Sequence, residues 1–148
     1  MDLNLSGKHI LITGGSKGIG LACAQAFLAE GARVSLVSRS EANLARACES
    51  LSAHGNDCVQ THAADLTQPA SAQAALDAAI ATFGPVDVLV NSAGAAKRTP
   101  APELSPQAWH DAMQAKYFSY IHMIDPVIKQ MGQRGKGNIV NVVGNGGK

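Results

Sequence analysis

Cysteine, charge and long apolar runs are all scarce in this chain of 148 residues, and each shortage excludes a class of protein. The three cysteines stand far apart, form no Cys-x-x-Cys pair and are odd in number, which argues against a disulfide framework. Charged residues make up 16% of the chain and the formal net charge is +1, so we expect neither nucleic acid nor an anionic membrane as a partner. The five histidines show no ligand spacing, so no metal site is predicted.

Signals for export and for membrane insertion are also missing. The first eight residues carry neither a basic segment nor an apolar core, and no apolar stretch approaches the length of a membrane span. We therefore expect a cytoplasmic protein with reduced thiols and no membrane partner. The length fits one domain that can bury a core of its own.

Strand-like and helix-like segments alternate along the whole chain. The predicted strands are Lys8–Thr13, Arg33–Val37, Asp57–Ala63, Val86–Asn91 and Asn138–Val143. The predicted helices are Gly18–Glu30, Ser40–His54, Pro69–Phe83 and Ser105–Gly132. Helix starts are indicated by Ser40, Ser105 and Pro106, and helix ends by Gly31 and Gly55. This alternation predicts an α/β fold with a doubly wound, Rossmann-like parallel sheet, whose continuously apolar strands are covered on both faces.

A glycine-rich turn joins the first predicted strand to the first predicted helix. It runs Thr13-Gly14-Gly15-Ser16-Lys17-Gly18-Ile19-Gly20, a G-x-x-x-G-x-G spacing that lacks the GKS or GKT ending of an ATP-binding P-loop. Glycines let the backbone come close to a ligand, and unpaired N–H groups at a helix start face an anion. The turn is therefore predicted to hold a phosphate; an ordinary tight turn is the alternative.

Together with two further loops, this turn resembles the short-chain dehydrogenase/reductase family. The turn matches the family's T-G-x-x-x-G-x-G cofactor motif, Asp65-Leu66-Thr67 matches its adenine-contacting Asp, and Asn91-Ser92-Ala93-Gly94 matches its N-N-A-G. The segment from Gly137 to Val142 is similar to the family's fifth strand. The resemblance implies an oxidoreductase that moves a hydride between a nicotinamide cofactor and a carbonyl or alcohol substrate.

The resemblance also assigns roles to the loops that follow the strands, where the ligand crevice of such sheets opens. Residues expected to cradle the diphosphate are Gly14, Ser16, Lys17, Gly18 and Ile19. Asp65, followed by Leu66, would contact the adenine, and Asn91 with Gly94 would lie on the ribose side. The alternatives are an exposed acid near a helix start for Asp65, and turn residues that close a strand for Asn91 and Gly94.

The preferred cofactor follows from charge at the end of the second strand. An acid at that position binds the 2′-hydroxyl of NAD, whereas a basic residue accommodates the 2′-phosphate of NADP. Here the strand runs into Ser38-Arg39-Ser40 with no acid, and Lys17 adds a second cation from the glycine-rich turn. We therefore expect NADP(H) rather than NAD(H); the alternative is that Arg39 and Lys17 are solvated surface cations.

The family's catalytic Tyr-x-x-x-Lys pair is missing from residues 1–148. Tyr117 and Tyr120 are followed four residues later by Ile121 and Ile124. In the family this pair lies beyond the fifth strand, so we expect residues 1–148 to be a single domain truncated after that strand and inactive by itself. No catalytic residue is predicted within it.

Two more positions depart from the family pattern. Lys116 stands seven residues after Trp109, where the family has a catalytic Asn, and Gly144 stands where the family has a Ser. Lys116 borders a predicted apolar stripe on its helix, which consists of Trp109, Met113, Tyr117, Tyr120 and Ile124. Lys116 either takes the place of the Asn in a proton relay or extends to solvent, and we favour the second. At Gly144, backbone N–H groups or the Asn145 amide would supply a donor, or the segment is a loop tip.

Three hypotheses about function remain open at this point. The leading one is an NADP(H)-dependent oxidoreductase acting on a small carbonyl or alcohol, a homo-oligomer by analogy with the family. The second is a catalytically silent NADP-binding module that regulates or senses. The third is a scaffold that binds no dinucleotide.

Overall fold

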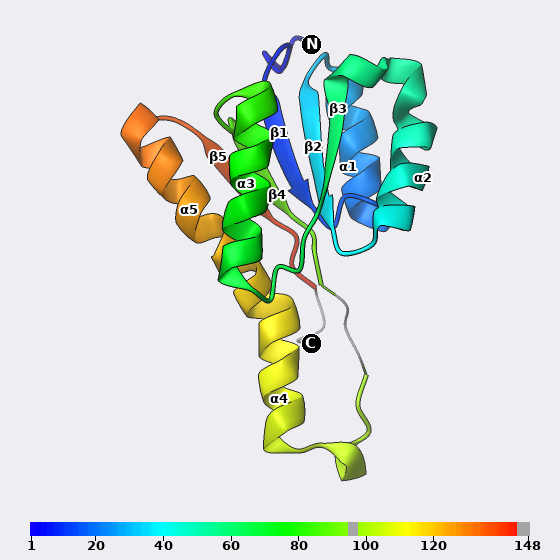
Figure 1. Cartoon of the computed structure of the whole chain (residues 1–148), viewed down its shortest axis with the longest axis vertical. Coiled ribbons are helices and arrows are strands. Elements are labelled where there is room, and N and C mark those ends of the chain that lie inside the picture. The colour runs from blue at the N-terminus through cyan, green and yellow to red at the C-terminus, as the bar shows by residue number, and fades with distance from the viewer. Residues whose placement is uncertain (95–97, 145–148) are drawn as a thin grey trace.

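The computed structural model describes residues 1–94 and 98–144, and within them five parallel strands form one sheet. The strands are β1 (His9–Thr13), β2 (Arg33–Ser38), β3 (Val59–Ala63), β4 (Val88–Asn91) and β5 (Asn138–Asn141). Their order across the sheet is β3-β2-β1-β4-β5, so the chain winds outward from β1 in both directions (Figure 1). The predicted doubly wound, Rossmann-like fold is confirmed.

Helices cover both faces of this sheet (Figure 1). The α-helices are α1 (Gly18–Ala29), α2 (Glu41–Leu51), α3 (Pro69–Phe83), α4 (Pro106–Met113) and α5 (Ser119–Arg134). Short helical turns are η1 (Ser52–His54), η2 (Asn56–Cys58), η3 (Ala101–Glu103) and η4 (Gln114–Phe118). Helices α1 and α2 lie on one face and α3 and α5 on the other, whereas α4 extends beyond the sheet. No helix in the described part of the chain is both long enough and apolar enough to cross a bilayer.

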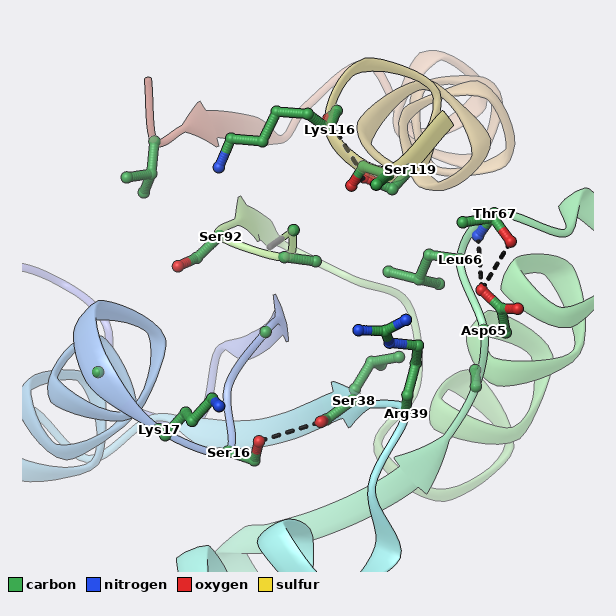
Figure 2. Close-up of a pocket in the computed structure, with 18 of the residues that line it drawn as sticks. Ser16, Lys17, Ser38, Arg39, Asp65, Leu66, Thr67, Ser92, Lys116 and Ser119 are labelled. Carbon is green, nitrogen blue, oxygen red and sulfur yellow. Dashed lines mark hydrogen bonds between the residues drawn. The ribbon is translucent and has the colours of Figure 1, made fainter. Parts of the chain in front are cut away.

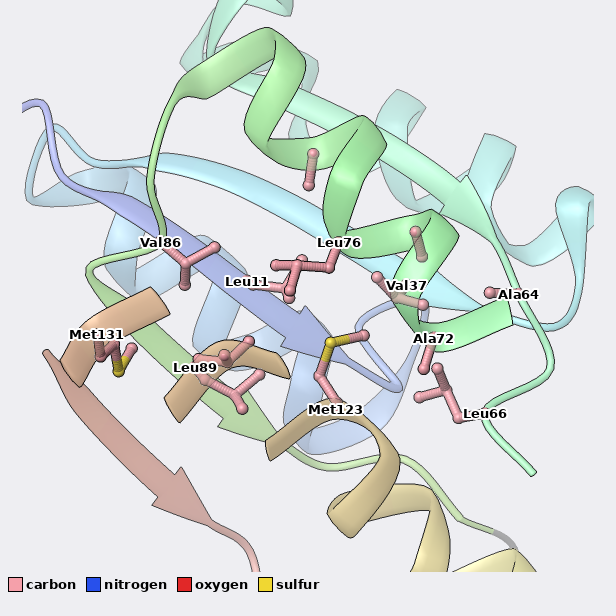
Figure 3. Close-up of a cluster of buried hydrophobic side chains, with 13 residues drawn as sticks. Leu11, Val37, Ala64, Leu66, Ala72, Leu76, Val86, Leu89, Met123 and Met131 are labelled. Atoms are coloured by element: carbon pink, nitrogen blue, oxygen red, sulfur yellow. The ribbon is translucent and has the colours of Figure 1, made fainter. Parts of the chain in front are cut away.

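Alternate residues of β1 contribute to two hydrophobic cores, one on each face of the sheet. Ile10 and Ile12 pack with the side chains of α1 and α2, and Leu11 packs with those of α3 and α5. Figure 3 shows the second core, in which Leu76 and Met123 close over Leu11. Because a strand places successive side chains on opposite faces, one apolar strand supplies both cores.

Coverage on both faces was predicted for all strands, and it is wrong for the two edge strands. Every residue of β1 and β4 is buried, but β3 is only half-buried and most of β5 is exposed. An edge strand has a neighbour on one side only, so fewer elements cover it. Both edge strands are also shorter than predicted, because Asn56–Cys58 form a helical turn and the pairing of β5 ends at Asn141.

The predicted starts of the second and fourth helices are confirmed by their caps. Ser40 Oγ accepts a hydrogen bond from the Asn43 N–H at 3.2 Å, and Ser105 Oγ accepts from the Ala108 N–H at 3.1 Å. Each cap satisfies a backbone donor that the first turn of a helix leaves unpaired.

The single long helix predicted from Ser105 to Gly132 is wrong in one respect, because a π-helical turn, η4, separates α4 from α5. The Ser119 hydroxyl donates to the carbonyl oxygens of Ala115 at 3.0 Å and Lys116 at 3.2 Å. Hydrogen bonds from a hydroxyl back to carbonyl oxygens of the preceding turn bend helices. The two Ser119 bonds lie at the π-helical turn, where the helix is wider than an α-helix. The first residues of the predicted apolar stripe are exposed rather than packed against the sheet, with Trp109 62% exposed and Tyr117 53% exposed.

A chain of polar side chains crosses β1, β2 and β3. His9 is fully buried, and its Nδ1–H donates to the Gly84 carbonyl at 2.7 Å, so Nε2 must accept from the Ser35 hydroxyl at 2.6 Å. Ser35 Oγ accepts from Gln60 Nε2 at 2.7 Å, and Gln60 Oε1 accepts from His62 Nε2 at 3.0 Å. Burial lowers the pKa of His9, because the charged ring would lose its hydration.

Candidate functional site

A cavity of about 480 Å³ opens at the carboxyl ends of the strands, where the loops after β1, β2, β3 and β4 meet (Figure 2). The structure brings together nine of the ten residues predicted to bind a cofactor. Those that line the cavity are Gly14, Ser16, Lys17, Gly18, Ile19, Arg39, Asp65, Leu66 and Gly94. The convergence follows from the parallel sheet, because all its strands end at the same edge.

The glycines of the first loop serve different purposes. Gly14 has φ +66°, and a Cβ there would lie 2.7 Å from the Ser92 carbonyl oxygen in the loop after β4. A Cβ at Gly20 would overlap the Gly14 carbonyl group. Gly18 also has a positive φ, +57°, but open space surrounds the position of its Cβ. Gly14 and Gly20 thus allow close backbone packing, whereas Gly18 leaves room beside the cavity.

The start of α1 offers unpaired backbone donors at the cavity. Lys17 precedes the helix with extended backbone, no side chain caps the first turn, and that turn contains no acid. Lys17, Gly18 and Ile19 all line the cavity. The helix dipole and the uncapped N–H groups favour an anion at this end, and the Lys17 ammonium adds a full positive charge.

The end of β2 adds a second cation. Ser16 Oγ donates to Ser38 Oγ at 3.0 Å, which joins the glycine-rich loop to β2. Arg39 follows Ser38, and Figure 2 shows its guanidinium directed into the space between Ser38 and Leu66. Within residues 1–94 and 98–144, Arg39 forms no salt bridge. Its planar set of donors is therefore available to a ligand.

Asp65 supplies the acidic group of the cavity. Its Oδ1 accepts hydrogen bonds from the Thr67 hydroxyl at 2.8 Å and from the Thr67 N–H at 3.0 Å. These bonds, with a smaller contribution from Arg39, lower the pKa of Asp65 below its usual value. The neighbouring Leu66 is buried, and its carbonyl oxygen accepts from His122 Nδ1 at 2.7 Å. The loop after β3 is thus attached to α5 on the far side of the cavity.

Asn91 does not line the cavity, unlike the other predicted residues. It is fully buried; its Oδ1 accepts from the Thr13 hydroxyl at 3.3 Å, and its Nδ2 donates to Asn141 Oδ1 at 3.0 Å. Thr13 Oγ1 in turn accepts from the backbone N–H groups of Ser92 at 3.2 Å and Ala93 at 3.3 Å. The Asn91 side chain therefore links the ends of β1, β4 and β5. Through Thr13 it also helps to hold the backbone of the loop at Ser92 and Ala93.

Sequence reasoning did not identify Thr13 and Asn141 as parts of this arrangement. Both are register partners of Asn91, one on each side of β4. The signal available in the sequence was a polar residue at the last position of two predicted apolar strands, Thr13 and Asn91, and near the end of a third, Asn141. Interpreting it required the register between strands, which a single sequence does not provide.

Lys116 is exposed, as expected for a side chain that extends to solvent, but it also lines the cavity. Its Nζ lies 5.8 Å from the centre of the Tyr120 ring. The Tyr120 hydroxyl donates to the Val142 carbonyl at 2.7 Å, and burial raises the pKa of that hydroxyl. Gly144 is exposed, and Asn145 lies outside the described residues.

Comparison with known proteins agrees with this geometry. A family model described as short chain dehydrogenase matches residues 8–148. D-threitol dehydrogenase of Mycolicibacterium smegmatis is 41% identical over 95% of this chain and 54% of its own length. L-sorbose reductase of Gluconobacter frateurii, solved with NADPH and L-sorbose, has a TM-score of 0.87 at 33% identity, covering 95% of this chain and 54% of that one.

A third similar protein is an actinorhodin polyketide ketoreductase variant solved with NADPH. It has a TM-score of 0.88 at 31% identity, over 99% of this chain and 56% of that one. The chain thus spans about half the length of the curated relatives it matches. Because the family match covers nearly all of its residues, the chain belongs to the short-chain dehydrogenase/reductase family.

Proposed function

We propose that the protein is an NADP(H)-dependent oxidoreductase that interconverts a carbonyl compound and an alcohol. The observation that carries this proposal is the charge of the cavity where β2 ends: Arg39 and Lys17 line it, and the turn Ser38-Arg39-Ser40 contains no acid. Two similar proteins were solved with NADPH, which supports the same preference here.

The residues present fit a phosphorylated dinucleotide. Uncapped N–H groups at the start of α1 and the open space beside Gly18 suit a diphosphate, and Lys17 supplies a balancing charge. The Arg39 guanidinium suits a 2′-phosphate, because its planar donors match phosphate oxygens in pairs. When bound, the nicotinamide supplies the hydride, and the protein binds and orients the reacting groups.

The remaining predicted residues would hold the two nucleoside halves. The Asp65 carboxylate keeps its Oδ1 on Thr67, which leaves Oδ2 to accept from the adenine amino group beside Leu66. Asn91 would act on the ribose side through the backbone that follows it, because its amide bonds to Thr13 and Asn141. Gly94 lines the cavity beside Lys116, and its backbone would lie on the ribose side.

We further propose that the protein assembles as a homo-oligomer in the cytoplasm. Trp109, Met113 and Tyr117 are each about half or more exposed along α4 and η4, and large exposed apolar patches mark interaction surfaces. The three cysteines are unpaired, which supports a reducing compartment.

A second candidate function is a catalytically silent NADP-binding module. The observation that favours it is Gly144, because glycine lacks the hydroxyl that the family's Ser presents to a substrate. Turnover of NADPH with a panel of ketones and aldehydes, measured on the full-length protein, separates the two. Tight NADPH binding with no turnover of any carbonyl would overturn the enzyme proposal and favour the module.

Cofactor preference is tested by the substitution Arg39→Ala. A charge-assisted hydrogen bond contributes about 1.5–3 kcal/mol, so we expect affinity for NADPH to fall roughly 10- to 100-fold. Affinity for NADH should change little, since it lacks the 2′-phosphate. Titration of each cofactor by its fluorescence measures both constants. The matched control is Arg46→Ala, which removes an exposed arginine of α2. Equal losses for NADPH and NADH would contradict the proposed role of Arg39.

A further inference from the structure

The two departures from the family pattern lie near the same end of the cavity, although Gly144 itself does not line it. Lys116 and Val142 both line it, and Gly144 follows Val142 by two residues. Tyr120 connects them, because its hydroxyl donates to the Val142 carbonyl and its ring lies beneath the Lys116 ammonium. Gly144 offers no side-chain donor near this end of the cavity, whereas Lys116 offers a charged one.

The Lys116 side chain follows a defined path into the cavity. Gly94 has φ +122°, and a Cβ at that position would lie 2.9 Å from Lys116 Cδ and 3.0 Å from the Ala115 carbonyl oxygen. The missing side chain of Gly94 thus makes room for the methylene groups of Lys116. Figure 2 shows the side chain passing over the segment that carries Ser92.

The Lys116 ammonium has no carboxylate partner among the described residues. All eleven acidic residues of the chain lie within residues 1–94 and 98–144, and the salt bridges found there join Lys129 to Asp125 and Arg134 to Asp87. The Tyr120 ring offers the ammonium a weak attraction at 5.8 Å. No acidic side chain in residues 1–94 and 98–144 therefore neutralises the charge at this wall of the cavity.

Two serine hydroxyls, those of Ser119 and Ser92, also lie at this end of the cavity. The Ser119 hydroxyl donates to the Ala115 and Lys116 carbonyl oxygens, so its proton is already used within the helix. Ser92 is the other hydroxyl lining this end. A charged N–H forms a stronger hydrogen bond to a developing negative charge than a neutral O–H does.

We propose that the Lys116 ammonium binds the oxygen of the carbonyl substrate and delivers its proton, an inference that rests on the proposed function. In reduction, a hydride from the reduced nicotinamide forms the new C–H bond, and the carbonyl π pair moves onto oxygen. That oxygen takes a proton from Lys116 Nζ, and water returns a proton to the amine. The carbonyl is reduced by two electrons and the nicotinamide oxidised by two. The positive charge of Lys116 stabilises the oxygen where negative charge develops.

Activity of substituted full-length protein provides the first test. Loss of one such donor lowers kcat by about 100- to 1000-fold, so we expect Lys116→Gln to have this effect while NADPH affinity stays within about twofold. Lys116→Arg, which retains the charge, should keep more activity than Lys116→Gln. The matched control is Lys136→Gln, at an exposed lysine between α5 and β5. Wild-type-like kcat in Lys116→Gln, or a large loss in Ser92→Ala alone, would overturn the inference.

A binding measurement tests Lys116 without turnover. Reductive methylation with ¹³C-formaldehyde labels the lysines, and Lys116→Arg identifies the Lys116 resonance by its loss. Butyrate serves as the probe because its carboxylate imitates a negatively charged substrate oxygen. We expect butyrate to shift the Lys116 resonance saturably in protein saturated with NADP⁺, and the Lys129 resonance to stay in place.

The same titration separates the two proposals. It is run with and without NADP⁺. If butyrate does not shift the Lys116 resonance in either titration, the proposed role of Lys116 is overturned. Failure of NADP(H) to bind, with a saturable butyrate shift at Lys116, overturns the proposed cofactor and retains Lys116 as the oxygen-binding group.

Discussion

Two regions of the molecule border the same cavity but differ in how firmly they are packed. The sheet centre, which we define as β1, β2 and β4 with α1, α2 and α3, buries nearly every strand residue. The arm, which we define as α4, η4 and β5, has no buried residue in α4 or η4 and is mostly exposed in β5. The proposed cofactor residues lie mainly on the first region, and Lys116 lies on the second.

The difference shows how the proposed binding roles are divided. Loops that follow buried strands inherit fixed positions, because core packing determines where each strand ends. Side chains on the arm have fewer contacts to hold them, so their positions depend on single interactions such as the contact of the Lys116 ammonium with the Tyr120 ring. The proposed cofactor side is therefore preorganised, whereas the proposed substrate side can adjust.

The largest expected effect is a loss of folding stability that differs between two neighbouring strands. Leu89→Ala, in β4, should lower the free energy of unfolding by about 2–5 kcal/mol, because it leaves a cavity at a fully buried position. Val140→Ala, in the adjacent β5, should change it by less than about 0.5 kcal/mol, because that side chain is 48% exposed. Urea unfolding followed by circular dichroism measures both. Similar losses would mean that the arm packs as tightly as the sheet centre.

An intermediate effect is expected at the glycine-rich loop. Alanine at Gly14 or Gly18 must adopt a positive φ, which costs about 1–2 kcal/mol at either position. At Gly14 the added methyl also meets the Ser92 carbonyl, so Gly14→Ala should cost about 1–3 kcal/mol more than Gly18→Ala. Denaturation midpoints of the two variants give the difference. Equal midpoints would show that the loops after β1 and β4 do not depend on this close approach.

The smallest expected effect contrasts two helix caps. Ser40→Ala removes the cap of α2 and should lower global stability by about 1 kcal/mol, because α2 is part of the sheet centre and packs on β1 and β2. Ser105→Ala removes the equivalent bond of α4, which should speed amide hydrogen exchange in α4 and leave the global midpoint unchanged. Hydrogen exchange with mass spectrometry distinguishes the two. A global loss from Ser105→Ala would show that the arm unfolds together with the sheet centre.

The sequence predicts the sheet centre well because its signals are local. The cap at Ser40, the strand–turn–helix order and the apolar run of β4 each depend on a few neighbouring residues. Once the strands are known to be parallel, their loops must meet at one edge. The cavity therefore contains nine of the ten predicted residues.

The remaining features depend on contacts between distant residues. The side chain of Asn91 turns away from the cavity because Thr13 and Asn141 lie beside it in the sheet. The π-helical turn accompanies the backbone bonds of Ser119, and the path of Lys116 needs a glycine more than twenty residues earlier. Neither periodicity nor motif spacing contains this information. The orientation of these side chains was therefore beyond prediction, although the residues themselves were identified.

The polar chain that runs from His62 through His9 to the Gly84 carbonyl makes the sheet centre sensitive to acid. Since the pKa of His9 is lower in the fold than in the unfolded chain, protons bind the unfolded state first. The neutral ring contributes its full stabilisation of the fold above the pKa of His9 in the unfolded chain, near 6.5. That contribution declines as the pH falls from 6.5 toward the lower pKa of His9 in the folded protein. A proton on Nε2 would face the Ser35 hydroxyl, itself oriented as a donor, so Ser35 would have to turn its hydrogen elsewhere. Acidification would thus loosen β1 beside β2, at the opposite end of the strands from the cavity.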